Sequence, residues 1–108
     1  MVATLAPDVT FWSPVTFKPF EGRDAVAMVL GAVMRVFEDF RYVEELEGDN
    51  SLALIFEATV AGKDVTGVDL MRFDADGLTK DITVMVRPLS ATLALRDAMG
   101  RELGVTSG

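Results

Sequence analysis

The sequence predicts an α+β fold in which a curved antiparallel sheet wraps around a long helix. Between residues 22 and 40, apolar side chains recur every three or four positions, which indicates an amphipathic helix. Residues 41–73 contain apolar, β-branched runs separated by the turn sequences EGDN and AGKD, which indicates an antiparallel meander. A second apolar pattern follows Pro88 and indicates a second helix. At 108 residues, we treat 1–108 as a single domain with one modest core.

The predicted elements follow one another as strand, helix, four strands and helix. Residues 8–13 are β-branched and aromatic, and the loop after them contains prolines. The long helix, residues 22–40, then carries Phe37 and Phe40 on its apolar side, and DADG makes the turn before the last strand. The second helix spans 90–103, with Ser90 as N-cap and Gly104 as C-terminal stop. We also consider a short helical turn at residues 2–6.

The charge and hydropathy of the chain bear on its partners. Ten basic residues against seventeen acidic ones give a net charge of -7, so we expect no nucleic-acid partner and no membrane partner. Hydrophobic residues make up 50% of the chain, and the mean hydropathy is +0.32. Such a chain has more apolar surface than a small domain usually buries alone, so we expect a homodimer.

The chain contains no histidine and no cysteine, which excludes several kinds of site. Ser-His-Asp triads, histidine bases, disulfides and His- or Cys-ligated metals are ruled out. Acid-base chemistry must come from carboxylates, the single Tyr42, lysines or water, and we expect no cofactor and no metal. No apolar run approaches the roughly 20 residues of a membrane span, and MVATLAPD does not resemble a signal peptide. A cytoplasmic location is the default expectation.

Asp69 stands out because it lies between Val68 and Leu70 in an apolar strand. Aspartate is a poor strand residue and is costly to bury without a partner. The neighbouring strand contributes a second carboxylate, Glu57. If the hairpin loop is residues 62–64, Glu57 lies opposite Asp69, with their Cβ atoms about 5 Å apart, and one of the two keeps its proton near neutral pH. With a two-residue loop, the two acids fall on opposite faces and the pair does not exist.

Two interpretations of these carboxylates remain open. In the first, both lie on a wet face of the sheet, where a dimer partner or the second helix partly covers Ile55, Met71 and Phe73. In the second, they lie in an apolar pocket as functional groups.

Two segments resemble a known superfamily. The segment PDVTFWSPVTFKPFEGRDAV (residues 7–26), followed by a helix, resembles the opening of ketosteroid isomerase-like and SnoaL-like polyketide cyclase domains, which belong to the nuclear transport factor 2-like superfamily. GVDLMRFDADGLTKDITVMV (residues 67–86) resembles the paired strands of the same superfamily. The match covers about residues 5–88. It implies a cone-shaped α+β domain with a curved sheet around an apolar cavity, commonly dimeric through the sheet.

The resemblance also implies roles for individual residues. Asp69 matches the aspartate that ketosteroid isomerases keep protonated as a hydrogen-bond donor to the substrate oxyanion. Ser13 occupies the position of their general base, and a serine is no base at neutral pH unaided. Their oxyanion tyrosine lies on an N-terminal helix that this chain lacks or shortens. Glu57 is the replacement base we can offer, and other members of the superfamily use a single strand carboxylate.

These observations lead to three hypotheses. The first is a SnoaL-like small-molecule pocket protein, a cofactor-free isomerase, cyclase or lyase that acts on an apolar carbonyl compound. The second is a non-catalytic ligand-binding or dimerisation module on the same fold, and the third is a truncated domain completed by a partner chain. For the first, the candidate catalytic residues are Asp69 and Glu57, and the candidate substrate-binding residues are Phe11, Ser13, Phe37, Ile55, Met71 and Val84.

Overall fold

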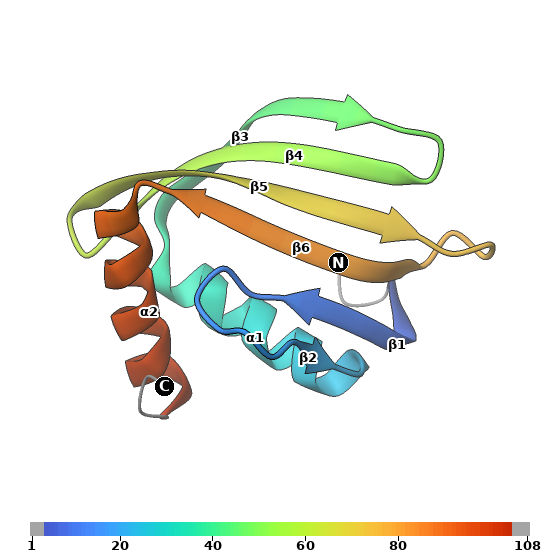
Figure 1. Cartoon of the computed structure of the whole chain (residues 1–108), viewed down its shortest axis with the longest axis horizontal. Coiled ribbons are helices and arrows are strands. Elements are labelled where there is room, and N and C mark those ends of the chain that lie inside the picture. Colours follow the sequence, from blue (N-terminus) through green and yellow to red (C-terminus); the bar gives the residue numbers. More distant parts are fainter. Residues whose placement is uncertain (1–3, 105–108) are drawn as a thin grey trace.

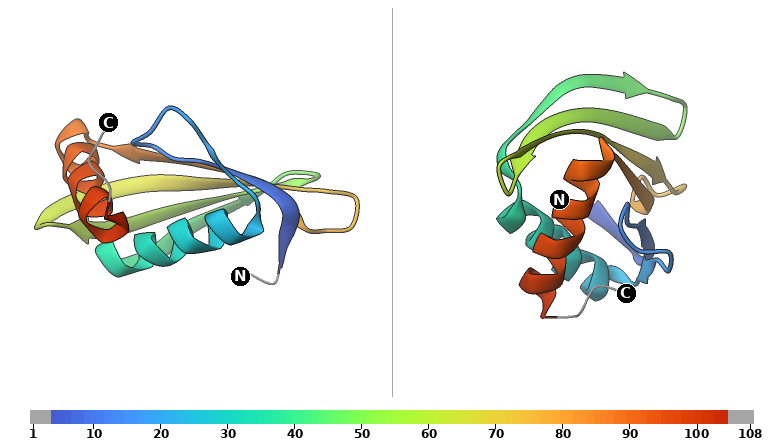
Figure 2. Two further views of the ribbon diagram at one scale, coloured as in Figure 1. Left: turned by 90° about the horizontal axis from the view of Figure 1, so that it is seen from below. Right: turned by 60° about the vertical axis from the view of Figure 1, so that its left-hand side comes forward.

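In residues 4–104, which the computed structural model describes, the chain forms a six-stranded sheet and two helices (Figure 1). The elements are β1 Leu5–Trp12, β2 Phe20–Glu21, α1 Arg23–Val36, β3 Glu38–Glu47, β4 Ser51–Val60, β5 Lys63–Phe73, β6 Thr79–Arg87 and α2 Leu89–Leu103. The sheet arches over both helices, which lie on its concave side (Figure 2). The predicted α+β fold with a curved sheet around a long helix is confirmed.

The sheet is mixed, whereas the sequence analysis predicted an antiparallel one. The strands lie in the order β2-β1-β6-β5-β4-β3, and every neighbouring pair is antiparallel except β1 and β6. These two strands run parallel, and the long connection that this requires consists of β2, α1 and the strands β3–β5.

No α-helix precedes β1 within residues 4–104, in line with the expected short or missing N-terminal helix. The helical turn considered at 2–6 lies partly outside the described residues, and β1 already begins at Leu5. Neither helix in residues 4–104 has the length and apolar character that a membrane crossing would need.

Helix α1 ends earlier than predicted, and this moves two aromatic residues from a helix to the sheet side of the cavity. Gly22, with φ 94°, begins the helix, and Phe37 leaves it in an extended conformation. Asp39 then takes a positive φ of 54°, and β3 has already begun at Glu38. The prediction that Phe37 and Phe40 belong to the helix is therefore wrong. The three-residue spacing of Phe37 and Phe40 fits the period of a helix, but the helix ends at Val36 and Phe40 lies in a strand, where side chains alternate.

Helix α2 begins one residue before its predicted start. Pro88 is its N-cap residue, so the N-cap role predicted for Ser90 is wrong. Gly104 ends the helix with φ 70°, in the left-handed conformation that glycine favours, and its predicted role as the stop is confirmed.

The hairpin between β4 and β5 has the shorter of the two loops considered. Val60 pairs with Lys63, so the loop is only Ala61 and Gly62, with φ of 49° and 77°. Two successive positive φ values suit a tight turn whose twist matches that of the flanking strands. In this register Leu54 is opposite Asp69 and Glu57 is opposite Thr66. The pairing of Glu57 with Asp69 that the longer loop would have produced does not form.

The core lies between the concave face of the sheet and the two helices. α1 contributes Val26, Val29 and Ala32, α2 contributes Ala91, Leu95 and Met99, and the strands contribute Leu5, Val9, Phe11, Phe56, Ala58, Val60, Val65, Met71 and Ile82. The Phe56 ring packs directly against the backbone of β5 at Gly67, where there is no side chain. A Cβ built on Gly67 would lie 2.4 Å from Phe56 Cζ and 2.7 Å from the Met85 carbonyl oxygen.

Candidate functional site

A cavity of about 590 Å³ lies within the concave side of the sheet, between the strands, the two helices and the loop after β1. This volume is in the range of small-molecule sites in proteins. Its walls are mostly apolar and are formed by Phe11, Pro14, Val15, Ala27, Val29, Leu30, Gly31, Val33, Met34, Phe37, Phe40, Met71, Ile82, Val84, Leu95 and Met99. Ser13, Arg41, Tyr42 and Asp69 are the polar residues that line it.

Asp69 lies on the concave face of β5, and its carboxyl group borders the cavity. Its direct partners across the sheet are Leu54 on β4 and Val84 on β6, so both of its neighbours in the sheet register are aliphatic. Burial raises the pKa of Asp69 from its ordinary value of 3.8 to about 6, because the charged form loses hydration in these surroundings. The strand places a single acid where apolar walls shift its titration toward neutrality.

Tyr42 on β3 is the hydrogen-bond partner of this acid. Its hydroxyl group donates to Asp69 Oδ2 at 3.2 Å. Burial, the charge of Asp69 and this hydrogen bond together raise the pKa of Tyr42 to about 12, so the phenol keeps its proton. In the other direction the hydrogen bond lowers the pKa of Asp69 and offsets part of the effect of burial.

These pKa values define the protonation states at neutral pH. With a pKa of about 6, about nine-tenths of Asp69 is ionised at pH 7. The carboxylate can then accept a proton, and its pKa is close enough to neutrality for the proton to be returned. This differs from the neutral donor that the ketosteroid isomerase resemblance implied for the same position. The geometry suits a base more than an oxyanion donor.

An aromatic cluster positions Tyr42 beside Asp69. The rings of Tyr42 and Phe40 are perpendicular, at 87°, with centroids 5.0 Å apart, and Phe40 stacks on Phe56 at 4.9 Å. Phe37 completes the cluster 5.5 Å from Phe56. Because Phe56 is fully buried over Gly67, the cluster connects Tyr42 to the core of the sheet.

Five of the six predicted substrate-binding residues line the cavity: Phe11, Ser13, Phe37, Met71 and Val84. Ile55 does not, because it shares the convex face of β4 with Glu57. Ser13 lies in the loop after β1, where its Oγ accepts a hydrogen bond from the Val15 amide at 3.1 Å.

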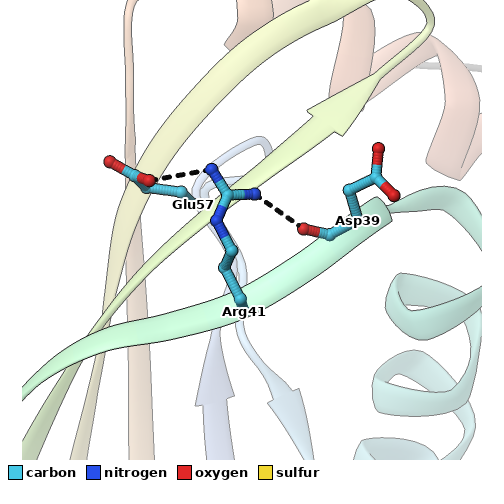
Figure 3. Close-up of polar contacts among 3 residues, drawn as sticks. All are labelled: Asp39, Arg41 and Glu57. Atoms are coloured by element: carbon cyan, nitrogen blue, oxygen red, sulfur yellow. Dashed lines mark hydrogen bonds and ion pairs between the residues drawn. The ribbon is translucent and has the colours of Figure 1, made fainter.

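Glu57 points away from Asp69, so its predicted role as a partner base is wrong. The Arg41 guanidinium donates to Glu57 Oε1 at 2.9 Å and to the Asp39 carbonyl oxygen at 2.9 Å (Figure 3). Because Arg41 pairs with Glu57 in the sheet register, this ion pair lies on the convex face. The two-residue hairpin loop is the physical reason, since it places odd-numbered residues of β4 and β5 on opposite faces.

Tyr42 is the site residue that the sequence analysis missed. It had been noted only as the single tyrosine available for acid-base chemistry. The alternation of Phe40 and Tyr42 with charged neighbours is a strand signal that could have placed both on one face. The assignment of Phe40 to the helix concealed that signal.

Among residues 4–104, no cluster of three or more Asp, Glu, His or Cys side chains could hold a metal ion.

Comparisons with known proteins identify a matching family and similar solved structures. The family model described as the SnoaL-like domain matches residues 1–82. A solved structure described as a steroid delta-isomerase from Pseudomonas aeruginosa is 43% identical, with a TM-score of 0.93, and the match covers 95% of this chain and 77% of that one. An uncharacterised bacterial protein with a cystatin-like fold from Silicibacter pomeroyi is 42% identical, with a TM-score of 0.93 and coverage of 95% and 73%.

A nuclear transport factor 2-like protein of unknown function from Mesorhizobium loti shares the fold at 20% identity, with a TM-score of 0.70 and coverage of 81% of this chain and 75% of that one. The search of curated proteins found no match. The family match over residues 1–82, together with the shared fold, shows that this chain belongs to the SnoaL-like domain family.

Proposed function

We propose that the protein catalyses a cofactor-free proton transfer on a small apolar carbonyl compound, as an isomerase, cyclase or lyase. The observation that carries the proposal is the placement of Asp69, whose carboxyl group borders an apolar cavity of about 590 Å³ and has a pKa raised to about 6. The likeness to a structure described as a steroid delta-isomerase supports the same class of reaction.

In this mechanism Asp69 is the catalytic residue and Tyr42 positions it. The carboxylate removes a proton from the carbon next to the substrate carbonyl and returns it at another carbon. Tyr42 holds Oδ2 through its hydroxyl, while the apolar walls exclude water and accommodate the rest of the substrate. Ser13 also lines the cavity, and its hydroxyl is a candidate donor to the carbonyl oxygen.

Two assays test the proposal. The first follows exchange of the α-protons of an apolar cyclic ketone in deuterated buffer by NMR, and the second follows conversion of a β,γ-unsaturated steroid ketone to its conjugated isomer by ultraviolet absorbance. Asp69→Asn should lower either rate by about 10²- to 10⁴-fold, because it removes the proton acceptor and keeps the shape. Glu57→Gln is the matched control, since it neutralises a carboxylate on the convex face. Equal rates in wild type and Asp69→Asn would overturn the proposal.

The second candidate function is a binding module that associates through its sheet, and the convex face favours it. Three large apolar side chains on this face are about half exposed: Trp12 at 42%, Leu46 at 54% and Met85 at 51%. By register they share the face with Ile55 and Leu70. We propose a homodimer through this face, because an apolar patch of this kind is typical of an interface.

Sedimentation equilibrium tests the homodimer. The wild type should sediment as a dimer, and Met85→Glu should shift it to a monomer without unfolding it. A monomeric wild type at high micromolar concentration would contradict the dimer and would leave the proton-transfer proposal standing. We keep a cytoplasmic location as part of the proposal, and fractionation of the source cells tests it.

A further inference from the structure

Asp69 lacks a positively charged partner. It forms no ion pair within residues 4–104, where the acids in ion pairs are Glu57, Asp97 and Glu102. One carboxylate oxygen, Oδ2, accepts the Tyr42 hydrogen bond, and the other, Oδ1, makes no hydrogen bond within the described part of the chain. A desolvated carboxylate in this state is stabilised by any cation that reaches it.

The one basic side chain among the described cavity-lining residues does not fill this role. Arg41 directs its guanidinium to Glu57 and to the Asp39 carbonyl oxygen, on the face of the sheet opposite Asp69 (Figure 3). Both hydrogen bonds are 2.9 Å long. The negative charge inside the cavity is therefore left for a ligand to neutralise.

Aromatic rings line the cavity next to Tyr42, the hydrogen-bond partner of the carboxylate. Tyr42 and Phe40 both line the cavity, and their rings meet at 87° with centroids 5.0 Å apart. Phe37 lies 5.7 Å from Phe40 and lines the same cavity. A carboxylate attracts an ammonium group through its charge, and an aromatic face within about 6 Å of the ion adds to the attraction. The remaining walls are aliphatic and suit the carbon substituents of such an ion.

We propose that the cavity binds an apolar ammonium ion, either a quaternary amine or a protonated tertiary amine, with its charge between the Asp69 carboxylate and the rings of Phe40 and Tyr42. This goes beyond the proposed reaction, because it needs the cavity and the ionised carboxylate but no proton transfer. A cavity of about 590 Å³ has room for an ammonium group with ring-sized substituents.

A pair of isosteric probes tests the proposal. Benzyltrimethylammonium carries a permanent charge, and neopentylbenzene has the same shape with a carbon in place of the nitrogen. Binding of each to the full chain is measured by NMR titration at pH 7.5. The cation should bind at least about tenfold more tightly than the neutral probe, since the ring faces and the carboxylate act on the charge alone.

Variants identify the groups responsible. Asp69→Asn should weaken binding of the cation about tenfold and leave the neutral probe unchanged. Tyr42→Leu should weaken binding of the cation more than Tyr42→Phe does, because only the leucine variant loses the aromatic ring. Glu57→Gln, which removes a charge on the convex face, is the control and should leave both affinities unchanged.

The pH dependence gives a further check. Asp69, with its pKa of about 6, is about one-tenth ionised at pH 5 and almost fully ionised at pH 7.5. Because the neutral acid should bind the permanent cation about tenfold more weakly, as Asp69→Asn does, the affinity should rise about fivefold between these two pH values. Tyr42 is the titratable group in contact with Asp69, and its pKa of about 12 keeps it protonated at both pH values.

Three results would overturn the proposal: no binding of the cation at millimolar concentration, equal affinities for the two probes, or undiminished cation binding in Asp69→Asn. The test is separate from the catalytic one. If the protein bound the cation but did not catalyse ketone exchange, this proposal would stand and the proposed reaction would be refuted. If it catalysed ketone exchange but did not bind the cation, the proposed reaction would stand and this proposal would be refuted.

Discussion

Asp69→Asn should make the protein more stable at neutral pH. The folded state raises the pKa of Asp69 from 3.8 to about 6, so ionisation of this carboxyl is less favourable in the folded chain than in the unfolded chain. Well below pH 3.8 the group is neutral in both states and has no effect. As the pH rises past 6 the folded state loses about 3 kcal/mol relative to the unfolded state. Asparagine keeps an oxygen for Tyr42 and removes the charge, so it removes this loss.

The gain from Asp69→Asn should itself depend on pH. A carboxyl with these two pKa values destabilises the fold by about 2 kcal/mol at pH 5 and by about 3 kcal/mol at pH 7.5. Urea unfolding of both proteins at these two pH values, which lie above the isoelectric point of 4.4, measures the difference directly. The other carboxylates are common to both proteins and cancel.

The control for this experiment is Glu57→Gln. Its exposed ion pair with Arg41 contributes no more than about 1 kcal/mol. If Asp69→Asn were no more stable than wild type at pH 7.5, or if its advantage were the same at both pH values, burial of the Asp69 charge would not be the cause of the shift.

Two further substitutions test the surroundings of the acid. Tyr42→Phe removes the hydrogen-bond donor to Asp69 Oδ2, so the pKa of Asp69 should rise further. The acid limb of the pH profile of the proton-transfer rate should then move to higher pH. An unmoved acid limb would mean that the 3.2 Å hydrogen bond has no influence on this pKa. Gly67→Ala should destabilise the fold by about 1–3 kcal/mol in urea unfolding, because its Cβ meets the Phe56 ring at 2.4 Å. The control is Gly31→Ala in α1, where the added Cβ would meet only Arg35 Nη1, at 3.4 Å. This change should stabilise the helix by up to about 1 kcal/mol. Equal effects of the two substitutions on stability would contradict the role of the Phe56 contact.

Much of the fold could be predicted because local signals agreed with one another. Turn sequences separated the strands of the meander, and the spacing of Val26 and Val29 marked the buried side of α1. The parallel pairing of β1 with β6 could not be derived in this way. It depends on contacts between the two ends of the chain, and no local periodicity records them.

The candidate site was predictable only in part. Asp69 could be found because a carboxylate in an apolar strand is unusual. Its partner could not be derived, because a difference of one residue in the hairpin loop moves Glu57 from one face of the sheet to the other. The position where α1 ends also determines the site, because β3 begins directly after it and carries both Phe40 and Tyr42.

The titration of the Asp69 carboxyl carbon by NMR shows directly whether burial in the cavity raises the pKa of this acid. Selective ¹³C labelling of aspartate, with Asp69→Asn to assign the resonance, gives the pKa of this group in the folded protein. We expect a pKa of about 6, set by burial in the cavity and moderated by the hydrogen bond from Tyr42. A value near 4, as for an aspartate in water, would contradict it.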